Sequence, residues 1–301
     1  MAALKAALAA GYRAIEVDVA LTGPYQSGVR KVFLGHYFNM KAAAGPSDKT
    51  PHDYAADELV KFKMRKRDQS KSLDIDDHIP LISEAITWAV ENQALLMVDP
   101  KTPARPIDQE HDRIIAQVLN EARERNALAN IVVKSVNSRA HTIAGISKFL
   151  DHPFSLYDGQ FLWSPIVNKS IKYTKENTLS SIDEWHNSTL NSRQVINYEL
   201  GLYYSAHWAA KDFTWNGKNY SNLIDYVKNL TTIGKRSAIW SIDAVGDKGT
   251  LDREYGWKFA GNSAHDKRGN PFRNLSYKLS NYLLINTDRP EWYEQFVTSP
   301  Y

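Results

Sequence analysis

The stretch Gly11-Tyr-Arg-Ala-Ile-Glu-Val-Asp-Val-Ala-Leu-Thr22 decides the fold of this chain and points to its site. From residue 15 to residue 21 the side chains alternate, so that one face is aliphatic and the other carries Glu16 and Asp18, which is typical of a β-strand. Two carboxylates two residues apart on a strand lie side by side and repel each other unless a positive group lies between them. A bound divalent cation would remove that repulsion. The alternative is an exposed strand with two solvated acidic side chains.

The composition is that of a globular protein, with 24% charged and 43% hydrophobic residues among 301. Lys and Arg total 37 against 34 for Asp and Glu, so the charge balance gives no signal for a nucleic-acid partner. No apolar run approaches the roughly 20 residues that span a bilayer. Cysteine is absent, which excludes disulfides and thiolate metal sites.

Helical and extended segments alternate on both sides of this strand. We expect a helix over 2–10 ended by Gly11, and an extended run over 31–37. A polar insertion, 41–78, follows; it is read as a solvated helix or lid, with an anionic-surface patch as the alternative. The remaining elements of the first half are a helix from Pro80, a strand over 94–99, a helix over 107–127, a strand over 131–133 and a helix over 138–150.

The second half is richer in aromatic residues, and its strands are less regular. We expect strands near 153–157, 193–198, 237–242 and 282–286, and helices near 178–188, 220–230 and 290–297. Short apolar strands alternating with helices predict one α/β domain over 1–301 with seven parallel strands. A (β/α)₈ TIM barrel needs eight, so we expect a barrel that lacks its first strand here; an open doubly wound sheet is the alternative.

Polar residues collect where the predicted strands end, which is where barrel enzymes carry their chemistry. Glu16, Asp18 and Asp99 form an all-oxygen set suited to Mg²⁺ or Ca²⁺. Lys101 shares the face of Asp99 and is suited to a phosphate oxygen, while His36 is placed to transfer a proton. Together they suggest phosphoryl transfer. A further residue, Trp240, either fills the core or stacks on a substrate.

Six segments resemble, in order, motifs of the glycerophosphodiester phosphodiesterase family. The first joins Ala-Leu-Ala-Ala-Gly11 to the strand Ile15–Thr22, and the others are Gly35-His36, Ile79-Pro-Leu-Ile-Ser-Glu84, Val98-Asp-Pro-Lys101, Ile239-Trp-Ser-Ile-Asp243 and Ile285-Asn-Thr-Asp-Arg-Pro290. The resemblance implies that Glu16, Asp18 and Asp99 bind the metal, His36 is a general acid/base, Lys101 contacts phosphate and Trp240 lines the substrate pocket.

Three positions depart from the family pattern. The third metal ligand is usually Glu, whereas Asp99 resembles the related sphingomyelinase D phospholipases, and Tyr37 replaces an Asp. The family's opening "HRG" strand, with its other catalytic histidine, would precede Met1. The resemblance implies a (β/α)₈ barrel. It also implies a metal-dependent hydrolase that converts glycerophosphodiesters to glycerol phosphate and an alcohol. Two alternatives stay open: a phospholipase D-like enzyme acting on lysolipid or sphingolipid headgroups, and a barrel that binds phosphate esters without turnover.

Five Asn-x-Ser/Thr sequons occur, all in the second half of the chain, at Asn168, Asn187, Asn219, Asn229 and Asn274. They favour a secreted or extracytoplasmic protein whose signal peptide is missing from these residues. The expected partner is a small phosphodiester or lysophospholipid substrate; the sequence makes no prediction of the oligomeric state.

Overall fold

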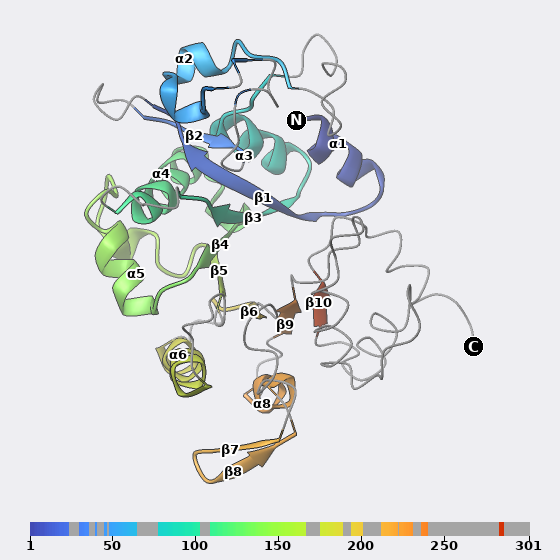
Figure 1. Ribbon diagram of the computed structural model, residues 1–301, viewed down its shortest axis with the longest axis vertical. Helices are drawn as coiled ribbons and strands as arrows, with labels where there is room; N and C mark the ends of the chain where they lie inside the picture. Colours follow the sequence, from blue (N-terminus) through green and yellow to red (C-terminus); the bar gives the residue numbers. More distant parts are fainter. Residues whose placement is uncertain are drawn as a thin grey trace. The chain divides into compact units, whose positions relative to one another are not determined.

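The computed structural model describes residues 1–23, 30–35, 40, 45–46, 48–64, 78–102, 109–166, 175–188, 194–200, 212–221, 223–230, 236–239 and 283–285 (Figure 1). The chain forms two compact units. The first comprises Met1–Ser135 and Ala140–Leu162, and the second Val136–Arg139 and Trp163–Tyr301. The expectation of a single domain stays a prediction.

Strand β1 (Ala14–Leu21) is the centre of the first unit. It follows helix α1 (Ala2–Ala9), and Gly11 makes the turn between them with a φ of +92°, a conformation that glycine adopts without strain. On one side β1 pairs antiparallel with β2 (Val32–Leu34), and on the other it pairs parallel with β3 (Leu95–Pro100). Strand β4 (Ile131–Ser135) then adds to β3 in parallel.

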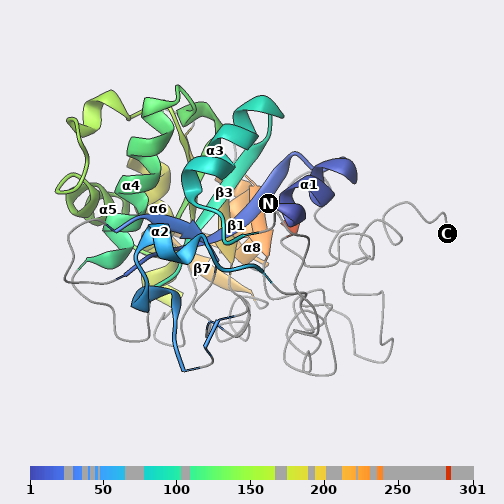
Figure 2. The same ribbon diagram turned by 90° about the horizontal axis from the view of Figure 1, so that it is seen from above.

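Two amphipathic helices, α3 (Ile82–Glu91) and α4 (Glu110–Glu124), pack against these strands and against each other (Figures 1 and 2). Helix α3 begins where the Leu81 amide donates to the Glu84 carboxylate at 3.0 Å, which satisfies one of the free N–H groups at a helix start. Their buried side chains recur at helical spacing and include Ile82, Ala85, Ile86, Ala89, Ile114, Ile115, Val118 and Leu119.

The insertion has an apolar side that its polar sequence did not predict. A 3₁₀ turn (Pro51–Asp53) precedes the short helix α2 (Ala56–Leu59). Leu59 and Met40 are fully buried in a small cluster with Phe33 of β2. This cluster anchors the described part of the insertion to the sheet beside the C-terminal end of β1.

The strand expected near 153–157 is wrong. Pro153 leads instead into a 3₁₀ turn (Phe154–Leu156), and the chain turns at Gly159 with a φ of +81° before the strand β5 (Leu162–Pro165). The aromatic and aliphatic residues of 153–157 favour a strand by propensity, but the flanking proline and glycine fix a turn there. Helix α5 (Arg139–Ile146) precedes this region, as expected.

In the second unit two isolated parallel bridges, Trp163–Val195 and Ile166–Glu199, connect the segment around β5 with the segment around β6 (Asn197–Leu200). Strands β9 (Arg236–Ile239) and β10 (Leu283–Ile285) continue the parallel order β6-β9-β10. The helices of this unit are α6 (Lys175–Ser188) and α8 (Leu223–Asn229). The helix expected near 290–297 lies outside the described residues.

A hairpin in the second unit was not predicted. Strands β7 (Phe213–Trp215) and β8 (Lys218–Tyr220) flank Asn216 and Gly217, both at positive φ. Asn-Gly is the residue pair that two-residue hairpin turns favour. The α/β class with parallel strands is confirmed, and within the described ranges no helix has the length and apolar character needed to cross a membrane.

Candidate metal and phosphate site

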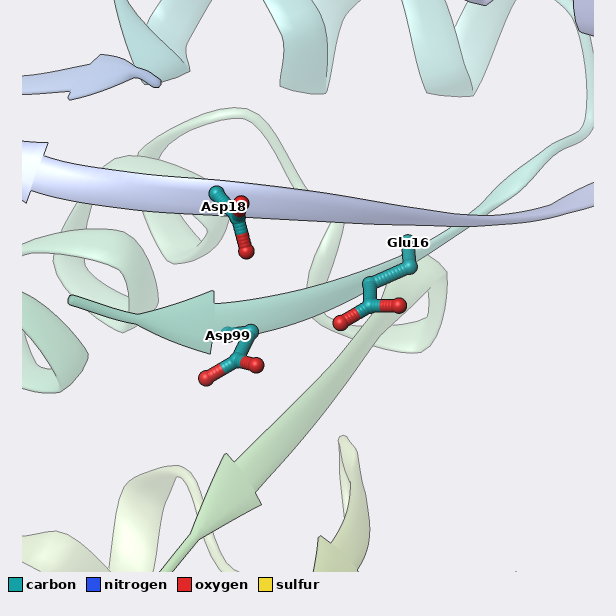
Figure 3. A group of neighbouring side chains, drawn as sticks. All are labelled: Glu16, Asp18 and Asp99. Atoms are coloured by element: carbon teal, nitrogen blue, oxygen red, sulfur yellow. The ribbon is translucent and has the colours of Figure 1, made fainter. Parts of the chain in front are cut away.

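Three carboxylates meet on one face of the first unit's sheet. Glu16 and Asp18 are two residues apart on β1 and therefore lie on the same face of the strand. The parallel register places Asp18 opposite Asp99 of β3. Each contributes one oxygen to a set whose members all lie within 4.8 Å of one another (Figure 3). Asp99 is buried, while Glu16 and Asp18 are partly exposed. The prediction that these three side chains lie together therefore agrees with their positions.

Lys101 lies beside two of these carboxylates. Its ammonium donates to Asp99 Oδ2 at 2.7 Å and lies 3.1 Å from Asp18 Oδ1. Burial by itself lowers the pKa of Lys101, but the charges of Asp99 and Asp18 outweigh it, so that the pKa is raised above 10.5. Lys101 therefore stays charged at neutral pH, and its side chain is 18% exposed.

A second lysine, which the sequence reasoning missed, completes the cluster. Lys134 of β4 donates to Glu16 Oε1 at 2.6 Å and lies 3.8 Å from Asp99 Oδ2, with only 1% of its side chain exposed. The signal was present: a lysine interrupts the apolar run Ile131-Val-Val-Lys134 in a buried strand. Because Met97 pairs with Val132, the alternation puts Lys134 on the same face as Asp99.

The two ammonium groups revise the sequence-based argument for a metal. The sequence suggests a divalent cation as the missing partner of Glu16 and Asp18, whereas in the structure Lys134 contacts Glu16 and Lys101 contacts Asp18. Repulsion between the acids is thus relieved partly by the protein itself.

The oxygens nevertheless fit a hard divalent cation. Ligands of one Mg²⁺ or Ca²⁺ lie about 2.0–2.6 Å from the ion, so two of them are at most about 5 Å apart. The spread of 4.8 Å among Glu16, Asp18 and Asp99 satisfies this limit. All three donors are carboxylate oxygens. Mg²⁺ and Ca²⁺ prefer such oxygen ligands, whereas zinc sites usually include nitrogen or sulfur ligands.

Two predicted site residues, His36 and Trp240, lie outside the described residues. The residue before His36 is described: the Gly35 amide donates to the Asp18 carbonyl at 2.8 Å. The chain therefore passes beside Asp18 directly before it reaches His36. Ser135, another residue at a strand end, is buried and shares a 2.7 Å hydrogen bond with Thr142 of α5, so it belongs to the helix-facing side of β4.

No family model and no curated protein matches the sequence. Solved structures do match. A protein from Silicibacter pomeroyi described as a glycerophosphoryl diester phosphodiesterase superposes with a TM-score of 0.59 and 13% identity, over 99% of this chain and 87% of that one. A glycerophosphodiester phosphodiesterase from Parabacteroides distasonis gives 0.52 and 14%, over 98% and 87% of the two chains. A third, described in the same way, from Galdieria sulphuraria gives 0.52 and 11%, over 98% and 89%. These likenesses confirm the expected α/β barrel type of fold.

Proposed function

We propose that this chain is a metal-dependent phosphodiesterase of the glycerophosphodiester phosphodiesterase family, which hydrolyses glycerophosphodiesters to glycerol phosphate and an alcohol. The observation that carries the proposal is the convergence of Glu16, Asp18 and Asp99 with Lys101 on one sheet face. Solved structures with these names share the fold, which supports the same assignment.

Glu16, Asp18 and Asp99 would hold Mg²⁺ or Ca²⁺. When bound, such an ion supplies positive charge to a non-bridging phosphate oxygen and so favours attack on phosphorus. Lys101 touches Asp99 and Asp18 and is partly exposed, so its ammonium can donate to a second phosphate oxygen at the same place. Its positive charge would stabilise the transition state more than the bound substrate, because negative charge grows on the phosphate oxygens in the transition state.

His36 would donate the proton that the leaving alkoxide needs, and Trp240 would form a wall of the substrate pocket. Support for His36 is the hydrogen bond from the Gly35 amide to the Asp18 carbonyl, because the residue before His36 then lies beside one of the proposed metal ligands. Support for Trp240 is its place directly after β9, at the C-terminal end of a parallel strand.

We also propose that the protein enters the secretory route. Among the five sequons, those at Asn187, Asn219 and Asn229 lie in the described part of the chain, and all three asparagines are exposed. An acceptor for N-linked glycan must be accessible, and these three meet that requirement.

The test of the proposed function is hydrolysis of glycerophosphocholine and glycerophosphoethanolamine, followed by measuring released glycerol 3-phosphate. Wild-type protein should be active with Mg²⁺ or Ca²⁺ and inactive with EDTA, and should recover when the cation is restored. Lysophosphatidylcholine, assayed beside them, tests the preference for water-soluble diesters. Folded protein that releases no glycerol phosphate with either cation, or that is insensitive to EDTA, would overturn the proposal.

A further inference from the structure

We propose that Lys134 is a positioning residue that sets the charge of the carboxylate cluster, and thereby weakens cation binding while strengthening the binding of the anionic substrate. The proposal rests on the proposed function, because it takes Glu16, Asp18 and Asp99 as the metal ligands. The observation behind the proposal is that the buried Lys134 ammonium lies 2.6 Å from Glu16 Oε1 and 3.8 Å from Asp99 Oδ2.

The lysines and carboxylates alternate in space. Lys134 lies between Glu16 and Asp99, and Lys101 lies between Asp99 and Asp18. Asp99 is thus shared by both ammonium groups, and Glu16 and Asp18 each contact one of them. A cation that binds all three carboxylates must therefore compete with two ammonium groups that are already there.

The two lysines differ in exposure, and this separates their roles. The side chain of Lys101 is 18% exposed, whereas that of Lys134 is 1% exposed. Lys101 can therefore contact a phosphate group that enters the site. The ammonium of Lys134 contacts Glu16 and Asp99 and is shielded from solvent, so it acts on a ligand through these carboxylates and through its own charge.

Charge balance gives the effect of Lys134 its sign. Three carboxylates and two ammonium groups leave these five side chains with one net negative charge, and a divalent cation reverses it to one positive charge. That positive charge attracts a phosphodiester monoanion. Without the charge of Lys134 the net charge of the site would be two negative units, and the site would attract the cation more strongly. With the cation bound, the net charge would then be zero and would not attract the anionic substrate.

The two affinities are thus expected to move in opposite directions when the charge of Lys134 is removed. A side chain that only maintains the fold would weaken both when it is lost, since the carboxylates would be displaced. Opposite signs therefore distinguish a charge-setting role from a merely structural one.

The experiment compares wild-type protein with Lys134→Met and Lys134→Arg, and uses Lys148→Met as the control. Lys148 is exposed, so the control removes one positive charge from the surface. Calorimetry measures the Kd for Mg²⁺ or Ca²⁺ alone and then the Kd for glycerol 3-phosphate at saturating cation. Neither measurement requires turnover.

Lys134→Met should bind the cation about tenfold or more tighter and glycerol 3-phosphate about tenfold or more weaker, because one charge within 4 Å of two carboxylates has been removed. Lys134→Arg keeps the charge and should stay within about threefold of wild type for the cation. Lys148→Met should match wild type for both ligands, because the charge that it removes is exposed to solvent and is screened by salt.

Weaker cation binding by folded Lys134→Met, or no change in either Kd, would overturn the inference while leaving the metal site intact. If wild-type protein itself binds neither cation, it is the proposed function that fails. Should Lys134→Met fold only when Mg²⁺ or Ca²⁺ is present, the inference is supported, since the cation then replaces the lost counter-charge. Should it fold under neither condition, Lys134→Arg decides: a change above tenfold in cation Kd with the charge retained contradicts the charge-setting role.

Discussion

Lys134 reaches across strand β3 to Glu16, and its Nζ lies 2.6 Å from Glu16 Oε1 although β1 and β4 are not neighbours in the sheet. The bond passes beside Asp99, which β3 contributes between them. One side chain thus connects three strands on the face that carries the proposed site. The site combines three carboxylates with two ammonium groups, so changes to single residues should have effects that differ in kind.

Asp18→Asn tests the metal ligands. The substitution keeps the size of the side chain and removes its charge, so cation affinity should fall by about tenfold or more. Hydrolysis of glycerophosphocholine should fall by at least about a hundredfold, because even outer residues that support metal ligands cost 10–100-fold. Calorimetry and a glycerol 3-phosphate assay measure the two effects. Glu124→Gln removes an acid whose side chain is 67% exposed on α4, and it should leave both unchanged.

Lys101→Gln tests the phosphate contact. Loss of the ammonium should lower kcat/KM by about 10²–10³-fold, the range observed when one donor to a transition-state oxyanion is removed. Because the pKa of Lys101 is raised above 10.5, wild-type kcat/KM should show no loss from Lys101 deprotonation up to about pH 10. A pH–rate profile of both proteins checks this. A wild-type alkaline limb below pH 9 that disappears in Lys101→Gln would contradict the assignment.

His52 should make stability depend on pH. Burial, and then the Arg30 guanidinium 3.5 Å away, lower the pKa of His52 from 6.5 to about 4. The unfolded chain therefore binds a proton below pH 6.5 that the folded chain does not, so the free energy of unfolding falls as pH drops from 6.5 toward 4. The slope in this window should approach about 1.4 kcal/mol per pH unit, measured by urea denaturation.

A second buried group limits that window. Burial raises the pKa of Glu110, which the Arg30 guanidinium contacts at 2.6 Å, so protonation of Glu110 favours the folded state as pH falls. The two effects oppose each other at the acidic end, and the slope should flatten there. His52→Gln should remove the slope between pH 6.5 and 5, whereas replacing the exposed His152 should retain it. An unchanged slope in His52→Gln would show that another group is responsible.

Gly145→Ala should destabilise the first unit. A Cβ at this position of α5 would lie 2.1 Å from Asp112 Oδ2 of α4, far inside contact distance. Alanine raises helix propensity by about 1 kcal/mol, but overpacking costs about 1–3 kcal/mol, and at 2.1 Å we expect overpacking to win. Thermal unfolding measures the loss. In an Asp112→Ala background the same substitution should be neutral or stabilising, because the obstructing carboxylate is gone.

Secretory expression in a eukaryotic host should yield glycosylated protein. Asn187, Asn219 and Asn229 are exposed, and we expect each of them to carry a glycan. The peptide that contains each asparagine should lose the mass of the glycan on treatment with an amidase that removes N-linked glycans. Mass spectrometry of the peptides locates the three sites. Changing Thr189, Ser221 or Thr231 to Ala removes the respective sequon without replacing the asparagine. Secreted protein with no glycan on any of the three would contradict the proposed route.

Sequence patterns predicted the first half of the chain well, because local signals and burial agree there. Strict alternation located β1, a continuous apolar run located β3, and four-residue spacing located α3. The convergence of Glu16, Asp18 and Asp99 followed from parallel strands ending at one edge, which needs no side-chain detail. These features follow from periodicity and register alone.

The features that were missed depend on distant contacts or on turns. Lys134 pairs with Glu16, 118 positions away, and nothing in the local sequence tells whether a strand lysine is solvated or buried. Leu59 is buried because the insertion folds back onto Phe33 of β2 and Met40, which are 26 and 19 positions earlier in the chain. The turn over Phe154–Leu156 replaced a strand because Pro153 and Gly159 outweighed the propensity of the residues between them.

The burial of Lys134 also fixes the alignment of β4. Ile131, Val132 and Val133 are interchangeable in shape, so they would pack nearly as well if the strand shifted by one residue along β3. Such a shift turns every side chain to the opposite face and would carry the ammonium away from Glu16 and Asp99 while leaving it out of water. An unpaired buried charge costs about 3–5 kcal/mol, a large part of the 5–15 kcal/mol that stabilises a typical domain. Lys134 therefore fixes the register of β4 against β3, because it disfavours the shifted pairings that an all-aliphatic strand would permit.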